Sequence, residues 1–275
     1  MMGDGPAQGR IQWDILGDTA WITIDNPRKR NAMDAHMWRQ VPEALTAIEA
    51  DERVRVVVLA GAGGTFCAGA DISDLQAIGP TVTDDPGQNL PVRAETALLD
   101  CPLPTIALIE GHCVGGGCQL AAACDIRIAT PSARFGITPA KLGLVYPPSS
   151  IQRLVEIVGP SAAKLLLFSG EILDAERAHH MRLVDEITED AHARVASLAA
   201  TMASRSALSV AASKELVDMA RRGEGLDGRA RHWQRLAATS GEAAEGVRAF
   251  LERRAPTFPY RHDGRPPTPE RTAAG

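Results

Sequence analysis

Two glycine-rich turns are the features of this 275-residue chain best suited to chemistry. One reads GAGG from Gly61 and the other reads GHCVGGG from Gly111, and each follows a short apolar run. Glycine lacks the side chain that would keep a ligand away from the backbone. We expect the second turn to open a helix at Gly116, whose first N–H groups lack helical partners and lie at the positive end of the helix dipole. The pattern therefore predicts a site for an oxyanion.

These turns do not match the known nucleotide-binding patterns. The chain contains no G-x-G-x-x-G fingerprint at either turn and no G-x-x-x-x-G-K-[ST] phosphate loop. A single glycine turn more often makes a tight connection than a binding site, but two turns that each follow a strand favour a site. A nucleotide-binding α/β enzyme is the disfavoured alternative, and NAD binding would support it.

The elements that must position the turns alternate between strands and helices. Residues 11–25 alternate apolar and polar side chains around Gly17 and predict a hairpin. Residues 34–52 carry apolar side chains every three or four positions, which predicts an amphipathic helix capped by Asp34. We expect further strands over 54–59, 105–109 and 125–129, and a helix over 118–124. This alternation predicts βαβ units in an α/β fold.

The rest of the chain divides into a core and a helical end. Residues 79–91 are rich in turn formers and acids, so we expect a mobile surface loop there. From about Ala191 the strand signals stop and alanine-rich helical patterns run to Glu252. We therefore predict a core over residues 1–195 and a helical region with its tail over residues 196–275.

Composition excludes several classes of protein. A net charge of -5 with mixed signs offers no basic surface for nucleic acid. The sequence contains no run of about 18 apolar residues, so it predicts no membrane span. Its five cysteines are odd in number and include no C-x-x-C pair. We expect a reduced, cytoplasmic protein. His179 and His180 are adjacent, which on a helix separates them by about 100°, and we expect no metal site.

Four segments in order resemble the crotonase, or enoyl-CoA hydratase/isomerase, superfamily. They are DNPRKRNAM from Asp25, TFCAGADISDL from Thr65, GHCVGGGCQLAAACDIRIA from Gly111 and ARFGITPAKLG from Ala133. The resemblance covers nearly the whole chain. It implies a spiral of ββα units with a helical C-terminal region that packs trimers, often paired into hexamers.

The resemblance also implies roles for individual residues. The backbone N–H groups of Ala70 and Gly116 correspond to the family's oxyanion hole, which would stabilise an enolate formed on a thioester. Coenzyme A, as part of an acyl-CoA substrate rather than a separate cofactor, would lie along these residues: Ala68, Ala70, Asp71 and Ile72, with Arg28 near its phosphate. Arg28 beside two further basic residues could equally be solvated, and Asp71 could have a structural role.

The chain departs from the family's hydratases at both catalytic glutamate positions. Gln119 stands three residues after the oxyanion glycine, and Pro139 occupies the second position, next to Thr138 on the expected pocket wall. Neither an amide nor a proline can serve as the acid or base that adds water to a double bond. Asp74, Asp84 or Asp85 could supply a carboxylate from elsewhere. Otherwise ordinary hydration is in doubt.

The segment TPAKLGLVY, ending at Tyr146, is similar to the corresponding part of bacterial methylmalonyl-CoA decarboxylase. Loss of CO2 from a malonyl-type thioester gives an enolate without a base, which suits a site without carboxylates. Tyr146 could orient the substrate carboxylate or reprotonate C2, or it could simply pack a turn. The prediction is an acyl-CoA lyase or isomerase that stabilises a thioester enolate, with decarboxylation of a malonyl-type thioester as the main hypothesis. The alternative is an enoyl-CoA hydratase or isomerase that uses non-standard acid and base residues. A CoA-binding protein that has lost catalysis is the alternative from another class.

Overall fold

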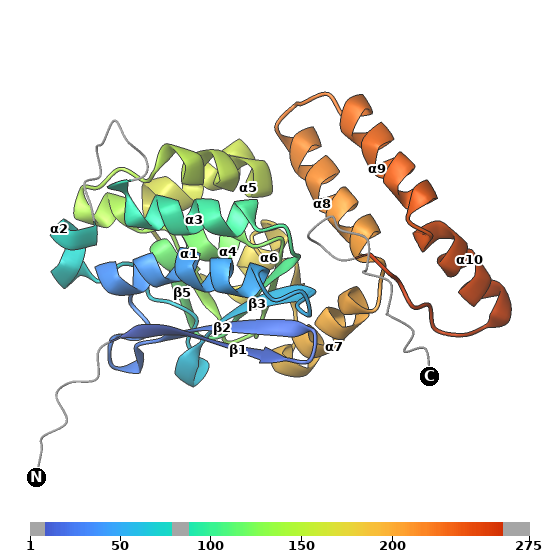
Figure 1. The fold of residues 1–275 in the computed structure, drawn as a ribbon. Helices are drawn as coiled ribbons and strands as arrows, with labels where there is room; N and C mark the ends of the chain where they lie inside the picture. Colours follow the sequence, from blue (N-terminus) through green and yellow to red (C-terminus); the bar gives the residue numbers. More distant parts are fainter. Residues whose placement is uncertain (1–8, 79–87, 261–275) are drawn as a thin grey trace, which may run out of the picture.

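A six-stranded sheet forms the centre of the computed structural model, which describes residues 9–78 and 88–260 (Figure 1). Its order is β1-β2-β3-β4-β6-β9, in which β1 and β2 form an antiparallel hairpin and the other neighbours run parallel. The strands are β1 Arg10–Leu16, β2 Thr19–Asp25, β3 Val56–Gly61, β4 Thr105–Ile109, β6 Ile126–Ala129 and β9 Glu186–Ile187. The predicted hairpin and α/β class are confirmed.

A smaller sheet of order β5-β7-β8 lies beside the second glycine turn. It consists of β5 His112–Val114, β7 Arg134–Gly136 and β8 Leu173–Asp174, with β7 parallel to β5 and antiparallel to β8. The helices of the body are α1 Ala35–Glu49, α2 Leu75–Ile78, α3 Leu90–Asp100, α4 Gly116–Ala123, α5 Pro148–Ser169, α6 Ala175–His180 and α7 Ala191–Ala203.

Side chains of the large sheet alternate between two buried layers. Val57 and Leu59 of β3 pack into the main core together with α1, α3 and α4. Val56 and Val58 point to the opposite face, where they pack against α7. Because both faces of the parallel strands are covered, their sequences read as continuous apolar runs rather than alternating patterns.

Helix α1 begins where the sequence predicts. The Asp34 carboxylate accepts a hydrogen bond from the Met37 N–H at 2.9 Å and so caps the helix, which ends at Glu49. One face of the helix is buried, including Trp38, which is completely shielded from solvent. This burial sets the side chain of Trp38 against the second glycine turn, as described below.

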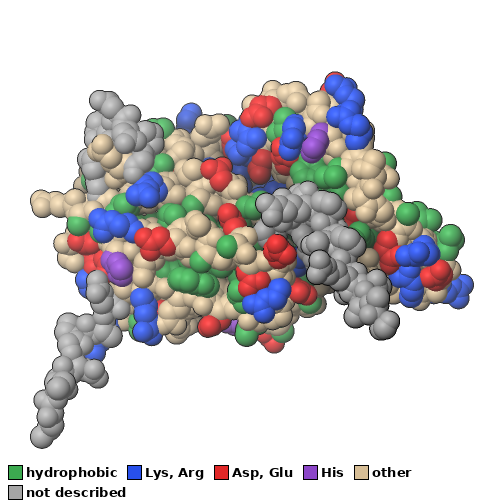
Figure 2. Space-filling view, in the orientation of Figure 1, with side chains coloured by type: hydrophobic (Ala, Val, Ile, Leu, Met, Phe, Trp, Pro, Cys, Tyr) green, Lys and Arg blue, Asp and Glu red, His purple; other side chains and the backbone are tan. Residues whose placement is uncertain are grey.

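The last three helices form an arm beside the body: α8 Ala207–Arg221, α9 Asp227–Thr239 and α10 Glu242–Glu252 (Figure 1). Their own buried cluster is small and centres on Leu208 and Tyr260. Figure 2 shows apolar side chains exposed along this arm among charged ones. The helical C-terminal region is confirmed, while the boundary expected at residue 195 falls inside α7 and stays a prediction.

Two parts of the second half of the core differ from the predictions. The segment His112–Val114, expected to be part of a turn, is strand β5, because it pairs with β7, which begins at Arg134. Residues 90 and 91, expected in a loop, open helix α3, where Pro91 suits the first turn. The rest of that loop, residues 79–87, lies outside the described residues.

No single helix within residues 9–78 and 88–260 is long and apolar enough to cross a bilayer. Helices α7 and α8 pass such a test together, but they are bent by 107° at their junction. One face of α7 is also buried against the sheet. The described residues contain no group of three or more His, Cys, Asp or Glu that could hold a metal ion.

Candidate active site

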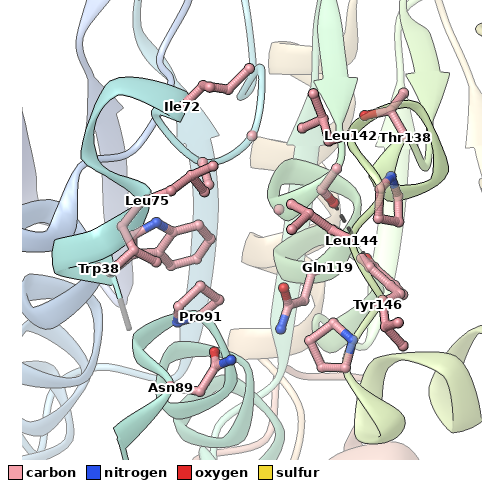
Figure 3. A pocket seen from close by; sticks show the side chains of 18 of the residues that line it. Trp38, Ile72, Leu75, Asn89, Pro91, Gln119, Thr138, Leu142, Leu144 and Tyr146 are labelled. Carbon is pink, nitrogen blue, oxygen red and sulfur yellow. Dashed lines mark hydrogen bonds between the residues drawn. The ribbon is translucent and has the colours of Figure 1, made fainter. Parts of the chain in front are cut away.

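A cavity of about 180 Å³ opens between helices α1, α3 and α4 and the segment that precedes α5 (Figure 3). Its walls are largely apolar, and Figure 3 shows Trp38, Leu75 and Pro91 on one side and Leu144 and Tyr146 on the other. None of the described residues that line it is Asp, Glu, Lys, Arg or His. The polar side chains on its wall are Asn89, Gln119, Thr138 and Tyr146.

The backbone amides of Ala70 and Gly116 lie close together on this wall. A Cβ atom built on Gly116 would lie 3.4 Å from the Ala70 nitrogen, and one built on Gly69 would lie 3.4 Å from the Gly116 nitrogen. Within the described part of the chain neither N–H donates a hydrogen bond. Gly116 is the first residue of α4, so its N–H lies at the positive end of the helix. Two free donors therefore meet at the cavity.

Parallel backbone pairing brings the two glycine segments together. The Cys67 N–H donates to His112 at 2.7 Å, and the Val114 N–H donates back to Cys67 at 2.9 Å. A Cβ on Gly117 would lie 2.3 Å from the Cys67 oxygen, so glycine is required for this approach. The turn that ends in Ala70 is therefore held directly against the start of α4.

Tyr146 contacts the backbone that carries one of these donors. Its hydroxyl donates to the Gly115 carbonyl oxygen at 3.3 Å, and the Gln119 N–H donates to the same oxygen at 3.1 Å. Burial raises the pKa of Tyr146 well above its ordinary value, so the hydroxyl keeps its proton. In this arrangement that proton is directed at Gly115 rather than into the cavity.

Gln119 lies on the cavity wall and contacts a carboxylate that sequence reasoning missed. Its Nε2 donates to Oε2 of Glu95 at 3.1 Å. The hydroxyls of Ser149 and Ser150 donate to the same Oε2 at 3.0 and 2.9 Å. Burial raises the pKa of Glu95, against the effect of these hydrogen bonds. The sequence did hold an indication that Glu95 is buried. Leu98 and Leu99 follow it at three- and four-residue spacing, which puts Glu95 on the apolar face of α3.

Asp71 forms part of the structure beside Ala70. Its carboxylate accepts from the Ser73 N–H at 3.1 Å and so caps the 3-10 turn Ile72–Asp74, and it pairs with Lys29. Although burial by itself would raise it, the pKa of Asp71 is lowered overall by the hydrogen bonds from Lys29 and Ser73. Arg28, next to Lys29, is exposed.

The remaining candidates are distributed around the cavity. Ala68, Ile72, Thr138 and Pro139 line it, as expected of binding residues. Asp74, considered as a source of a carboxylate, instead accepts from the Ala35 N–H at 2.7 Å at the start of α1. Asp84 and Asp85 lie outside the described residues.

The two cysteines that flank the glycine turns are buried free thiols. Burial raises the pKa of Cys67 to about 12, so it is a poor nucleophile near neutral pH. Cys118 lies with its Sγ 2.8 Å from the Cys113 oxygen, inside the packing of α4 against β5. Both thiols act as small buried side chains.

The fold and the cavity define an α/β protein with an apolar pocket that can receive a ligand oxygen on two backbone N–H groups. The chain belongs to the enoyl-CoA hydratase/isomerase family, which it matches over residues 16–261.

Known proteins resemble the chain along most of its length. A putative enoyl-CoA hydratase of Thermus thermophilus is 34% identical, with 88% of this chain and 98% of that protein covered. The 2,3-dehydroadipyl-CoA hydratase of Escherichia coli is 32% identical, with 86% and 93% covered.

Solved structures agree with this. A putative enoyl-CoA hydratase/isomerase family protein from Hyphomonas neptunium superposes with a TM-score of 0.84 at 36% identity, covering 91% of this chain and 98% of that one. Another family member reaches 0.87 at 36% identity, covering 94% and 99%. These comparisons give no support to the local resemblance to a decarboxylase.

Proposed function

We propose that this protein binds an acyl-CoA thioester with its carbonyl oxygen between the N–H groups of Ala70 and Gly116. The observation that carries the proposal is the meeting of these two free donors at the wall of an apolar cavity. When charge moves from C2 to the thioester oxygen, two preorganised donors stabilise the resulting enolate. Removing one such donor typically lowers a rate by about 10²–10³.

The reaction we propose is hydration or double-bond isomerisation of an enoyl-CoA. The relatives named above are hydratases, which favours chemistry at C2 and C3 over decarboxylation. Decarboxylation, predicted from the missing glutamates and the segment that ends at Tyr146, assigns Tyr146 to the substrate carboxylate or to C2, but the proton of its hydroxyl is directed at Gly115. Among the described residues the wall carries no cationic side chain, which also disfavours a substrate with a second carboxylate there.

The proposed site lacks both glutamates of the family's hydratases, since Gln119 and Pro139 occupy their positions. The Gln119 amide can hold a water molecule or a hydroxyl by a hydrogen bond, but it cannot take its proton. Hydration would then depend on a weaker base than in the family's hydratases. Slow turnover of enoyl-CoA is the expected behaviour of wild-type protein.

The coenzyme A part of the substrate would leave the cavity past an exposed apolar rim. Ile72 and Leu142 lie on opposite sides of its upper part in Figure 3, and they are 63% and 49% exposed. Ala68 also lines the cavity, and Arg28 is an exposed cation on the turn Pro27–Lys29 that could meet a phosphate. No separate cofactor is required, because proton transfer and enolate formation are polar steps.

We also propose that the protein assembles as a trimer or as a pair of trimers. Three large apolar side chains of α10 are exposed, at 62% for Val247, 82% for Phe250 and 74% for Leu251. Exposed apolar side chains gathered on one helix are typical of a protein interface. A cytoplasmic location remains our prediction.

The test is mass spectrometry of the products from a panel of enoyl-, malonyl- and 3-hydroxyacyl-CoA thioesters. We expect conversion of enoyl- or 3-hydroxyacyl-CoA, and a change from Ala70 to proline should abolish it. Proline removes the N–H and places its ring where the thioester oxygen would bind, whereas Ala70→Ser keeps the donor. Thermal unfolding of both variants controls for folding. Tight binding of acyl-CoA without any turnover would instead identify a non-catalytic binding protein.

A further inference from the structure

Glu95 is a buried carboxylate whose two oxygens have different surroundings. The residue is 1% exposed. Its Oε2 accepts three hydrogen bonds, from Gln119, Ser149 and Ser150, while its Oε1 has no partner among the described residues. Burying such a group is costly unless it is well paired.

The three donors on Oε2 determine how the Gln119 amide is turned. An oxygen that receives three hydrogen bonds is the unprotonated one, whatever the charge of the carboxyl group. Only the Nε2 end of an amide can donate, so this end must face Glu95. The carbonyl end, Oε1, is then directed away from Glu95, and Figure 3 shows the Gln119 side chain reaching into the cavity.

Within the described residues, the side-chain oxygen of Gln119 accepts no hydrogen bond. The wall around it is largely apolar, and the Tyr146 hydroxyl already donates to Gly115. Gln119 lies three residues after Gly116 on α4, so its side chain lies about one helical turn, roughly 5 Å, from the Gly116 N–H. A thioester whose oxygen binds at Gly116 would bring an atom attached to its C3 within reach of the Gln119 oxygen.

We propose that Glu95 is a positioning residue that fixes the Gln119 oxygen toward the cavity, so that the site selects acyl-CoA thioesters carrying a hydrogen-bond donor on C3. This inference rests on the proposed acyl-CoA site and adds to it the residue that sets the direction of the Gln119 amide. A 3-hydroxyacyl-CoA satisfies the Gln119 acceptor, whereas an alkyl group of the same size leaves it unpaired. The preference is produced by Glu95, although Glu95 does not line the cavity.

The test compares two isosteric ligands by isothermal titration calorimetry. 3-Hydroxybutyryl-CoA carries a hydroxyl on C3 where 3-methylbutyryl-CoA carries a methyl group. Mass spectrometry of the solution in the calorimeter corrects the concentration of the hydroxyl ligand for any dehydration. We expect wild type to prefer the hydroxyl ligand by about fivefold, the effect of one neutral hydrogen bond. Glu95→Gln gives position 95 both a donor and an acceptor, so the Gln119 amide can turn over. The preference should then fall to within about twofold while 3-methylbutyryl-CoA still binds.

Coupling between the two residues separates positioning from general destabilisation. Gln119→Met should remove the same preference, and adding Glu95→Gln to it should change the ratio no further. Glu43→Gln on the exposed face of α1 is the matched control and should keep the wild-type ratio. If Glu95→Gln fails to fold, Gln119→Met still tests the preference from the cavity side.

Two results would overturn the inference: equal binding of both ligands by wild type, or a wild-type ratio retained in Glu95→Gln or in Gln119→Met. The failure of the proposed function looks different, because neither ligand would then bind or Ala70→Pro would leave their binding unchanged.

Discussion

The hydroxyl of Tyr146 donates to the carbonyl oxygen of Gly115 at 3.3 Å, and this oxygen belongs to the same peptide unit as the Gly116 N–H. The described chain contains no cis peptide bond, so the carbonyl and the N–H point in opposite directions across one rigid plane. A hydrogen bond at one end of this plane therefore sets the direction of the donor at the other end.

The first prediction follows from this plane. Tyr146→Phe should lower kcat/KM for an enoyl-CoA about tenfold, because the Gly116 N–H is less well aimed at the thioester oxygen. Steady-state kinetics would measure it, with binding of a saturated acyl-CoA expected to change less than kcat. An unchanged kcat would show that the Gln119 N–H alone holds the Gly115 carbonyl.

Gly116 should not tolerate a side chain. A Cβ at this position would lie 2.8 Å from Cζ2 and 3.0 Å from Cη2 of Trp38, which is fully buried. Gly116→Ala should therefore lower activity by at least about tenfold and lower the melting temperature. Gly228→Ala on α9 meets nothing within 4 Å and serves as the control. Trp38→Phe should partly rescue Gly116→Ala, and equal activity of the two alanine variants would contradict the prediction.

Exchanging the amide and the carboxylate should increase hydration. In the double variant Gln119→Glu, Glu95→Gln the same hydrogen bond runs in the opposite direction and the carboxylate lies on the cavity wall. A base positioned there should raise the rate of crotonyl-CoA hydration by about 10². The single change Gln119→Glu should do less, because two adjacent carboxylates repel and one becomes protonated. Absorbance of the enoyl thioester measures both, and the absence of any gain would exclude Gln119 from the reacting face.

Asp71 should contribute to stability in a pH-dependent way. Its pKa is lowered in the folded state, so the ionised form stabilises the fold above the unfolded pKa, about 3.9, and this contribution is lost as pH falls through the folded value. Asp71→Asn should be less stable than wild type at pH 7, and the gap should narrow toward pH 3. Urea unfolding at pH 7, 5 and 3 would show this. A gap that stays constant with pH would mean that the charge of Asp71 has no part in it.

The exposed apolar face of α10 should be covered in the assembled protein. Phe250→Arg together with Leu251→Arg should reduce the mass measured by size-exclusion chromatography with light scattering, because two charges cannot be buried in an apolar contact. Leu16→Arg at the end of the β1 hairpin strand, 66% exposed, is the matched control. An unchanged oligomer in the α10 variant would place the interface elsewhere.

The sequence by itself determined the elements whose signals are local. The Asp34 cap, the hairpin around Gly17 and the apolar run of β4 each depend on neighbours within a few residues, and all were predicted close to their observed bounds. The family followed from ordered motifs along the chain, and both oxyanion candidates were named from these motifs.

Tertiary structure decided the features that depend on contacts distant in sequence. Strand β5 exists because it pairs with β7, and helix α3 was not predicted because the expected loop overlapped its start. Glu95 reads as an ordinary helical residue until α4 and α5 bring Gln119, Ser149 and Ser150 to it from 24, 54 and 55 residues away. The energy of a buried carboxylate depends on the donors that reach it. Only the folded chain could therefore show that the Gln119 amide donates to the Glu95 carboxylate, and that this hydrogen bond orients the amide.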